Sequence, residues 1–385
     1  MHVYRRQEEH GTAVPRGQSV QVIGARLAKR IVRLAPCLGL LLLLASTTAR
    51  AGQPGEGQEL LFFGSAEANR IDPEQLPASN DALASADILY SLTRNRFRLL
   101  GELIVSTEEI ELERFQVGWL PHETTSLFAG RYHQPTNYWA SVYHHGQYLQ
   151  TSITRPNIEG WEDDSGVLQT HQTGLIVESN FGLRESTGLE IAVSYGSGSV
   201  IGNGVLEPFD IFDKEGVAGA SFAARIGFLP DILGNNAIGV ILGRSEFESS
   251  ESQLIIPDLA DVNQDLMGAF ANWTVGSWHV ISAAYHLRNE LDRATMRSSD
   301  SFTAGYVQLE KSISDWTLYG RWENTAGAEE SDYLTLFPDY VVQRSLIGVR
   351  LDFLKRHAVT LEVFDAENSA GDFKKIAIQW SAAFH

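Results

Sequence analysis

Apolar and polar residues alternate along most of the second half of this chain and much of its middle. From Arg96 onward the alternation comes in stretches of about ten residues, separated by turn-forming residues. A period of two residues indicates β-strands with two unlike faces. The pattern predicts fourteen strands, over residues 96–106, 109–119, 125–132, 171–181, 187–195, 217–228, 236–248, 264–274, 277–289, 300–311, 314–325, 340–354, 356–366 and 373–384.

The last stretch, Phe373–His385, has an apolar residue at every second position from Ile376 and ends in Phe384. It resembles the closing strand of bacterial outer-membrane barrels, which the barrel assembly machinery recognises. In that family the aromatic residue is usually the final one, whereas here His385 follows it. A soluble β-sandwich could end on the same pattern.

Connection lengths separate these two folds. From the second strand on, connections alternate between short and long, apart from the short 107–108 and 367–372. The long ones are residues 133–170, 196–216, 249–263, 290–299 and 326–339. Aromatic residues stand at the opposite strand ends, namely Trp119, Phe181, Phe228, Trp273, Trp278, Trp316, Phe353 and Phe384. These features predict an all-β, antiparallel, up-and-down transmembrane β-barrel with long extracellular loops and short periplasmic turns. Fourteen strands are expected, with sixteen as the alternative.

The N-terminal region has the features of an export signal. Basic residues precede a largely apolar run, Leu34–Ala45, which is followed by Ala49-Arg50-Ala51. A run of this length is too short to span a bilayer, so residues 1–51 are predicted to be a cleavable signal peptide. Residues 52–95 are polar and are predicted to be a periplasmic lead-in with one short helix at 80–92. The barrel is expected to occupy residues 96–385.

Composition excludes some partners. The formal net charge is −18, and removing residues 1–51 makes it more negative. A chain this acidic is not expected to bind nucleic acid. The only cysteine, Cys37, lies in the predicted signal, so no disulfide is expected.

Alternation also assigns the two faces of the predicted wall. Apolar positions such as Tyr285 and Leu287 are expected to face lipid, and their polar alternates a hydrated lumen. The charged residues expected to line the pore from the wall are Arg288, Arg321, Arg344, Arg350 and Asp352.

The long connection 133–170 carries the most distinctive motifs. They are Gly130-Arg131, Pro135, Tyr138-Trp139, His144-His145-Gly146, Leu149-Gln150-Thr151-Ser152, Arg155-Pro156 and Trp161-Glu162-Asp163-Asp164. This loop resembles that of porin-like proteobacterial outer-membrane proteins related to the phosphate-selective porins, although Asn137 stands where that family has glycine. The resemblance implies a barrel porin. Its many aromatic residues predict that the loop folds into the lumen. There, Arg131, His144, His145, Arg155, Glu162, Asp163 and Asp164 would line the constriction.

Enzymatic and metal chemistry are not favoured. The loop histidines, with His171 and the acidic run at 162–164, offer metal-ligand types, but their spacing matches no metal motif. No G-x-S-x-G or H-E-x-x-H sequence occurs. We therefore expect neither an enzyme nor a cofactor.

The sequence thus predicts an outer-membrane channel for passive diffusion of small hydrophilic or charged solutes. Weak cation preference is expected because the outer loops are acidic. The alternative is a non-conducting barrel scaffold whose loops bind a surface ligand or metal. Expected partners are outer-membrane lipid and lipopolysaccharide, and the barrel assembly machinery through Phe373–His385.

Overall fold

A computed structural model describes residues 57–384, except 109, 144–145, 163–165, 185, 210–218 and 251–252. The predicted signal peptide and the site candidates His144, His145, Asp163 and Asp164 therefore lie outside the described residues. Within the described part, no helix is long and apolar enough to cross a membrane.

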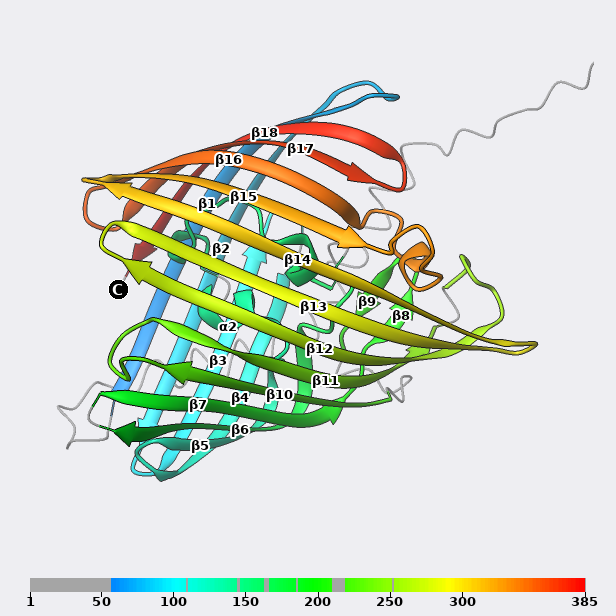
Figure 1. Cartoon of the computed structure of the whole chain (residues 1–385). Helices are drawn as coiled ribbons and strands as arrows, with labels where there is room; N and C mark the ends of the chain where they lie inside the picture. Colours follow the sequence, from blue (N-terminus) through cyan, green and yellow to red (C-terminus); the bar gives the residue numbers. More distant parts are fainter. Residues whose placement is uncertain are drawn as a thin grey trace, which may run out of the picture.

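Strands make up most of the described chain (Figure 1). They are β1 (Gly57–Pro73), β2 (Ser79–Arg94), β3 (Phe97–Ser106), β4 (Ile110–His122), β5 (Thr125–His133), β6 (His171–Arg184), β7 (Thr187–Ser197), β8 (Val200–Gly202), β9 (Val205–Glu207), β10 (Ala220–Leu229), β11 (Ala237–Ser249), β12 (Leu259–Val275), β13 (Trp278–Arg293), β14 (Arg297–Ile313), β15 (Trp316–Ala326), β16 (Val341–Phe353), β17 (His357–Asn368) and β18 (Gly371–Phe384). The helical elements are short: α2 (Tyr138–Tyr143), η1 (Gln147–Leu149), η2 (Asn157–Glu159) and η3 (Leu334–Leu336).

Sixteen of these strands, all but β8 and β9, form one closed antiparallel barrel. Neighbours in sequence pair around the wall, β7 pairs with β10, and β1 pairs with both β2 and β18. The small β8–β9 hairpin lies in the connection between β7 and β10, and β8 pairs with the end of β11. Because each barrel strand has two neighbours, the wall has no free edge.

The predicted fourteen strands correspond to β3–β7 and β10–β18, but the expected total of fourteen is wrong and sixteen is correct. Residues 57–94, predicted as a lead-in outside the barrel, form β1 and β2 of the wall. The helix predicted at 80–92 is also wrong. Alanine and leucine in this stretch fit a helical period, but Asp81, Ser85 and Asp87 also lie an even number of residues apart, as on one face of a strand, with alanine at positions 82, 84 and 86. Pairing with β1 and β3 decides in favour of the strand.

The two ends of the barrel differ in their connections. The longest connections, residues 134–170, 198–219 and 327–340, all lie at the end that we call the loop end. Strand β18 finishes at the other end, the turn end, where most connections are tight turns. Two exceptions occur. The loop-end connections that follow β1, β3, β13 and β17 are short, and the turn-end connection between β10 and β11, residues 230–236, is longer than the other turns.

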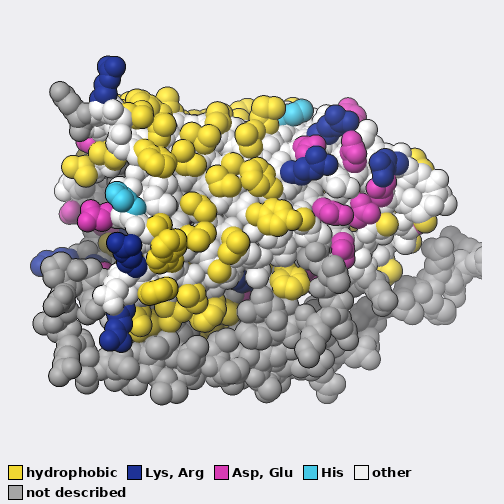
Figure 2. Space-filling model, turned by 90° about the horizontal axis from the view of Figure 1, so that it is seen from below, with side chains coloured by type: hydrophobic (Ala, Val, Ile, Leu, Met, Phe, Trp, Pro, Cys, Tyr) yellow, Lys and Arg dark blue, Asp and Glu magenta, His cyan; other side chains and the backbone are white. Residues whose placement is uncertain are grey.

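The outer surface carries an apolar band between charged regions at the two ends (Figure 2). Exposed residues of this band include Val193, Leu242, Leu318, Ile347 and Leu361. Aromatic residues stand at the turn end of the strands, as predicted, and the exposed ones include Trp119, Phe181, Phe228, Trp278, Trp316 and Phe384. A band of this kind with an aromatic rim is typical of a barrel surrounded by lipid.

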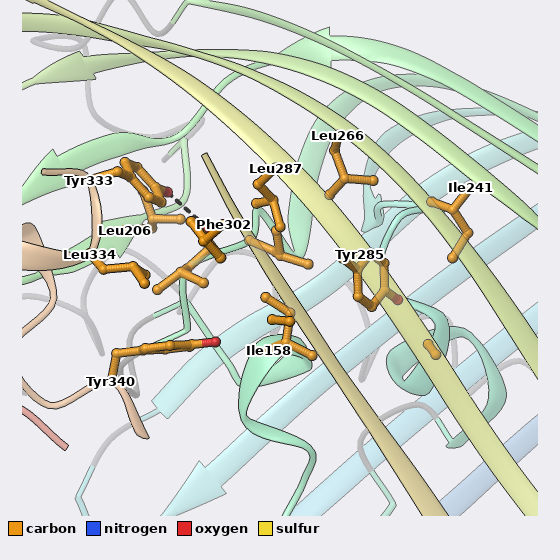
Figure 3. Packing of buried hydrophobic residues seen from close by; sticks show 14 of the residues in the cluster. Ile158, Leu206, Ile241, Leu266, Tyr285, Leu287, Phe302, Tyr333, Leu334 and Tyr340 are labelled. Atoms are coloured by element: carbon orange, nitrogen blue, oxygen red, sulfur yellow. Dashed lines mark hydrogen bonds between the residues drawn. The ribbon is translucent and has the colours of Figure 1, made fainter. Parts of the chain in front are cut away.

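The inside of the wall from β11 to β14 is apolar where it meets segments within the barrel (Figure 3). On β13, Tyr285 and Leu287 face inward and are buried, whereas Arg288 is exposed on the outside. The faces predicted for this strand are therefore reversed, and Arg288 is not a pore-lining residue. Alternation identifies which residues share a face, but here the inner face is the more apolar one because it packs against an internal loop.

Candidate pore constriction

We call residues 134–170 the inner loop, and its described residues lie inside the barrel (Figure 1). Trp139 is fully buried, and the ring of Tyr138 stacks on Phe270 of β12 with their centroids 4.0 Å apart. The side chain of Ile158 joins the same apolar cluster. The aromatic content of the loop predicted this packing, because rings of this size are costly to leave in water.

One carboxyl group is buried on the apolar side of the inner loop. Glu159 accepts hydrogen bonds from the backbone N–H of Trp139 and from the hydroxyl of Tyr285 on β13. The oxygen of the Tyr285 hydroxyl also lies 3.1 Å from the carbonyl oxygen of Thr136. Burial raises the pKa of Glu159 to about 7, even though the hydrogen bonds from Tyr285 and Trp139 favour the ionised form. This carboxyl group therefore ties two parts of the loop to the wall.

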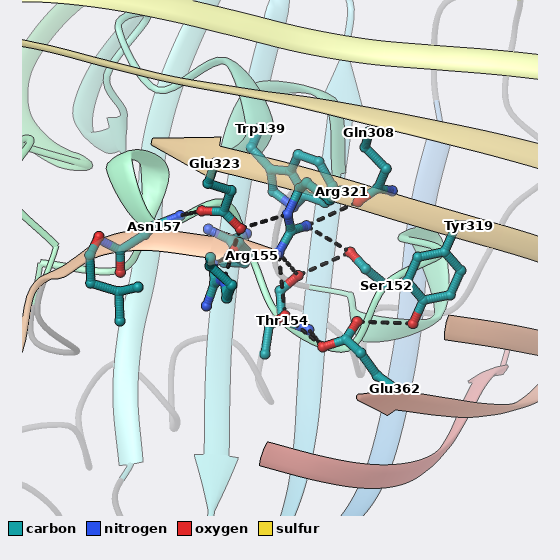
Figure 4. A network of polar contacts seen from close by, with 12 residues as sticks. Trp139, Ser152, Thr154, Arg155, Asn157, Gln308, Tyr319, Arg321, Glu323 and Glu362 are labelled. Carbon is teal, nitrogen blue, oxygen red and sulfur yellow. Dashed lines mark hydrogen bonds and ion pairs between the residues drawn. The ribbon is translucent and has the colours of Figure 1, made fainter. Parts of the chain in front are cut away.

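The opposite side of the inner loop contacts a charged wall (Figure 4). Arg321 on β15 donates to the side chain of Ser152 at 3.1 Å and to the carbonyl of Thr154 at 3.0 Å. Glu323 accepts from Arg321 at 2.8 Å and from the backbone N–H of Asn157 at 2.6 Å. Wall side chains thus bind the backbone groups that a loop in an irregular conformation leaves unpaired.

Two further wall residues extend this contact. Arg350 on β16 donates to the carbonyls of Tyr148 and Gln150, at 2.9 and 2.5 Å. Glu362 on β17 accepts from the backbone N–H groups of Ile153 and Thr154, at 3.0 and 3.2 Å. Arginines take loop carbonyls and carboxylates take loop N–H groups, so the pattern of wall charge matches the backbone polarity of residues 148–157.

Three of the predicted pore-lining arginines therefore hold the inner loop. Arg321, Arg344 and Arg350 are buried and face the lumen, as the alternation predicted. Arg344 donates to Glu323 at 2.7 Å and to the carbonyl of Arg155. The predicted Asp352 is an ion-pair partner of Arg350, with 2.7 Å between Nη2 and Oδ1.

A cavity of about 570 Å³ remains inside the barrel, between the inner loop and the wall formed by β1–β4 and β16–β18. On β1 it extends from Ile71 near the loop end to Phe63 in the middle of the strand. At this inner limit the ring of Phe63 lies against Gly146, where an added Cβ atom would come within 3.0 Å of the ring. The inner loop therefore narrows the lumen from one side.

Carboxylates outnumber cations around this cavity. The acidic lining residues are Glu67, Asp81, Asp87, Glu108, Glu111, Glu113, Glu162 and Asp339. The basic ones are Arg155, Arg344 and Lys375, with His171 between two carboxylates. The acidic residues of β2–β4 face the inner loop and its Arg155 across the opening.

The remaining described loop candidates occupy different positions. Arg155 lines the cavity with its guanidinium 3.4 Å from the centre of the Trp161 ring, and burial lowers its pKa to about 9. Glu162 lines the cavity and accepts from the backbone N–H of Thr170 at 2.9 Å. Arg131 is buried beside Glu111, at 3.2 Å, and is not among the residues that line the cavity.

Sequence reasoning missed much of the acidic wall. Glu67, Asp81 and Asp87 line the cavity but fall in the segment predicted to precede the barrel, so the sequence does not place them in the pore. Asp81, Ser85 and Asp87 lie an even number of residues apart, with alanine at positions 82, 84 and 86, and this spacing was the available signal. Within the described residues, no group of three or more His, Asp or Glu side chains is arranged to hold a metal ion.

No protein-family model matches the chain, and no curated protein matches it in sequence. Several solved structures have the same fold. An anion-selective porin from Comamonas acidovorans is 9% identical with a TM-score of 0.58, covering 86% of this chain and 100% of the porin. OmpF of Salmonella typhi, in a complex with daunomycin, is 12% identical with a TM-score of 0.58, covering 86% of this chain and 98% of OmpF.

The outer-membrane channel DcaP of Acinetobacter baumannii is 11% identical with a TM-score of 0.54, covering 88% of this chain and 100% of DcaP. At such low identity these likenesses establish the fold alone. The chain therefore has a porin-like β-barrel fold.

Proposed function

We propose that this chain is an outer-membrane channel for passive diffusion of small hydrophilic solutes, with a weak preference for cations. The observation that carries the proposal is the acidic cavity between the inner loop and β1–β4, inside a closed barrel. Solutes would pass this narrowed region without a cofactor or energy input, selected by width and by wall charge.

The balance of charge sets the expected selectivity. Lys375 is paired with Glu67 at 3.1 Å, and Arg344 shares the carboxylate of Glu323 with Arg321, so the charge of the basic lining residues is partly neutralised. The exposed carboxylates Asp81, Glu108 and Asp339 stand at the loop-end rim of the cavity. This arrangement favours cations over phosphate, despite the resemblance of the loop to that of phosphate-selective porins.

The outer surface supports a place in the outer membrane. The apolar band would contact lipid and the aromatic rim at the turn end would lie at the periplasmic headgroups. The loop end would then face the cell exterior and lipopolysaccharide. The C-terminal segment that contains most of β18, Phe373–His385, would be recognised by the barrel assembly machinery.

Reversal potentials across a salt gradient in a planar bilayer test the proposal. We expect cation preference at low salt, fading as salt rises and the screening length falls below about 10 Å. Replacing Asp81, Glu108 and Asp339 by their amides should weaken the preference without changing migration in unboiled SDS. Anion preference at low salt would contradict the proposed selectivity.

A second candidate is a barrel that does not conduct and binds a surface ligand through its loops. The observation in its favour is the large apolar cluster that joins the inner loop and residues 327–340 to the inside of β11–β14. Absence of any conductance from correctly folded, heat-modifiable protein would favour this scaffold over the channel.

A further inference from the structure

Asp87 differs from the other carboxylates of the cavity. It faces inward from β2, its residue is only 5% exposed, and it lines the cavity at the level of Phe63, its partner on β1. Neither of its carboxylate oxygens accepts a hydrogen bond from an N–H or hydroxyl group of the described residues, and the carboxyl group of Glu102 is within hydrogen-bonding reach of it. A buried carboxylate in this condition is costly, since it has lost water without gaining a donor.

Neighbouring carboxylates each have a basic partner. Glu102 contacts the guanidinium of Arg114, and Glu111 lies 3.2 Å from Arg131. Glu113 lies 2.7 Å from a ring nitrogen of His171. The charged groups that act most strongly on Asp87 are Glu102, Glu113 and Arg114, and Arg114 is already engaged by Glu102. Among these described carboxylates, Asp87 therefore differs in having no basic partner of its own.

The surrounding surface has both polar and apolar parts. Phe63, Leu83 and Ile104 line the cavity close to Asp87, and Ile153 of the inner loop lines it as well. A primary ammonium group could supply the N–H donors that the carboxylate of Asp87 lacks, while a short hydrocarbon chain lay against these apolar residues. The volume of about 570 Å³ is sufficient for a small organic molecule.

We propose that Asp87 is a binding subsite for the primary ammonium group of a small organic cation that enters the cavity. The inference rests on the proposed channel function, because it gives the solute class that would occupy the narrowed region. It does not require the cation to cross the membrane, so binding and conduction can be tested separately.

Calorimetric titration of the full-length folded protein in detergent with n-butylammonium chloride tests the subsite. Asp87→Asn removes the carboxyl group at nearly constant size, and Asp81→Asn removes a carboxyl group from the inner face of the same strand nearer the rim. We expect the first substitution to weaken binding at least tenfold and the second less than twofold. Tetramethylammonium, which has no N–H donor, should bind the unsubstituted protein at least tenfold more weakly than n-butylammonium.

Equal losses from Asp87→Asn and Asp81→Asn would overturn the proposal, because they would assign binding to the average negative potential. So would failure of the unsubstituted protein to bind n-butylammonium. Heat-modifiable migration in SDS verifies that each variant is folded. Binding without bilayer conductance would reject the channel and keep the subsite, whereas conductance with binding insensitive to Asp87→Asn would reject only the subsite.

Discussion

The inner loop meets two different surfaces of the same barrel. Towards β11–β14 it is packed by apolar side chains, with Trp139 fully buried, whereas towards β15–β17 it is bound by charged side chains such as Arg321 and Glu362. Apolar contact is non-directional and tolerates small shifts of the loop, but hydrogen bonds to individual backbone groups fix its position. The difference indicates that the apolar surface of β11–β14 supplies most of the attachment of the inner loop. The charged surface of β15–β17 sets the position of residues 148–157 beside the cavity.

Removing the loop breaks both contacts together. Deleting residues 137–164 should raise single-channel conductance several-fold, because the segment that narrows the lumen is lost. The barrel should keep its heat-modifiable migration in SDS, since the wall hydrogen bonds lie outside the deleted segment. Unchanged conductance, measured in a planar bilayer, would show that the loop does not limit the pore.

Breaking only the charged contact should have a smaller effect. Glu323→Gln leaves Arg321 and Arg344 without their shared carboxylate, and loss of one partner from a buried ion pair costs about 3–5 kcal/mol. We expect a lower thermal unfolding midpoint and noisier single-channel currents as residues 152–157 loosen. Glu330→Gln, on an exposed residue of the connection 327–340, is the matched control and should change neither.

The apolar contact should depend on pH through Glu159. The pKa of Glu159 is raised from 4.5 to about 7 in the folded protein. Between pH 4.5 and pH 7, Glu159 is therefore protonated while the inner loop is packed against the wall and would lose its proton if the loop detached. The packing of the inner loop against the wall is therefore most stable below about pH 4.5 and loses stability as the pH rises to about 7. Above pH 7 the loss is at most about 3 kcal/mol. Protease cleavage within the loop at pH 5 and pH 8 measures this change.

Glu159→Gln provides the comparison, because it removes the ionisable group and should make cleavage equal at the two pH values. A pH dependence that survives this substitution would have to come from another group.

The smallest expected effect is on the outer wall. Arg288 is exposed and its partner Glu290 lies 3.3 Å away, so Arg288→Ala should change stability by less than about 1 kcal/mol and leave conductance unchanged. Arg350→Ala, which removes two bonds to loop carbonyls, should in contrast alter single-channel currents. A change in conductance caused by Arg288→Ala would contradict the outward orientation of Arg288 and would indicate that it lines the lumen.

The sequence predicted most of the wall because strands such as β15 and β17 separate apolar from charged residues cleanly. It failed at β2, where small residues fit both a helical and a strand period and only pairing with β1 and β3 decides. The prediction also exchanged the inner and outer faces of β13, because Tyr285 and Leu287 are buried by segments inside the barrel and not by lipid. The same two errors removed Asp87 from the candidate site and placed Arg288 in it. Contacts made by distant segments, such as Glu362 with Ile153, cannot be derived from local periodicity.

The pairing of β1 with β18 has a consequence for the order of assembly. Phe62 lies opposite Phe384, so the contact that closes the barrel joins residues almost at the two limits of the described chain. Such a contact has a large loop-closure entropy cost until the intervening hairpins have formed and brought the two strands together. Neighbouring hairpins can pair locally, but β1 keeps an open hydrogen-bonding edge until β18 is in place. During that interval the open edges of β1 and β18 are the parts of the wall available for pairing with another chain.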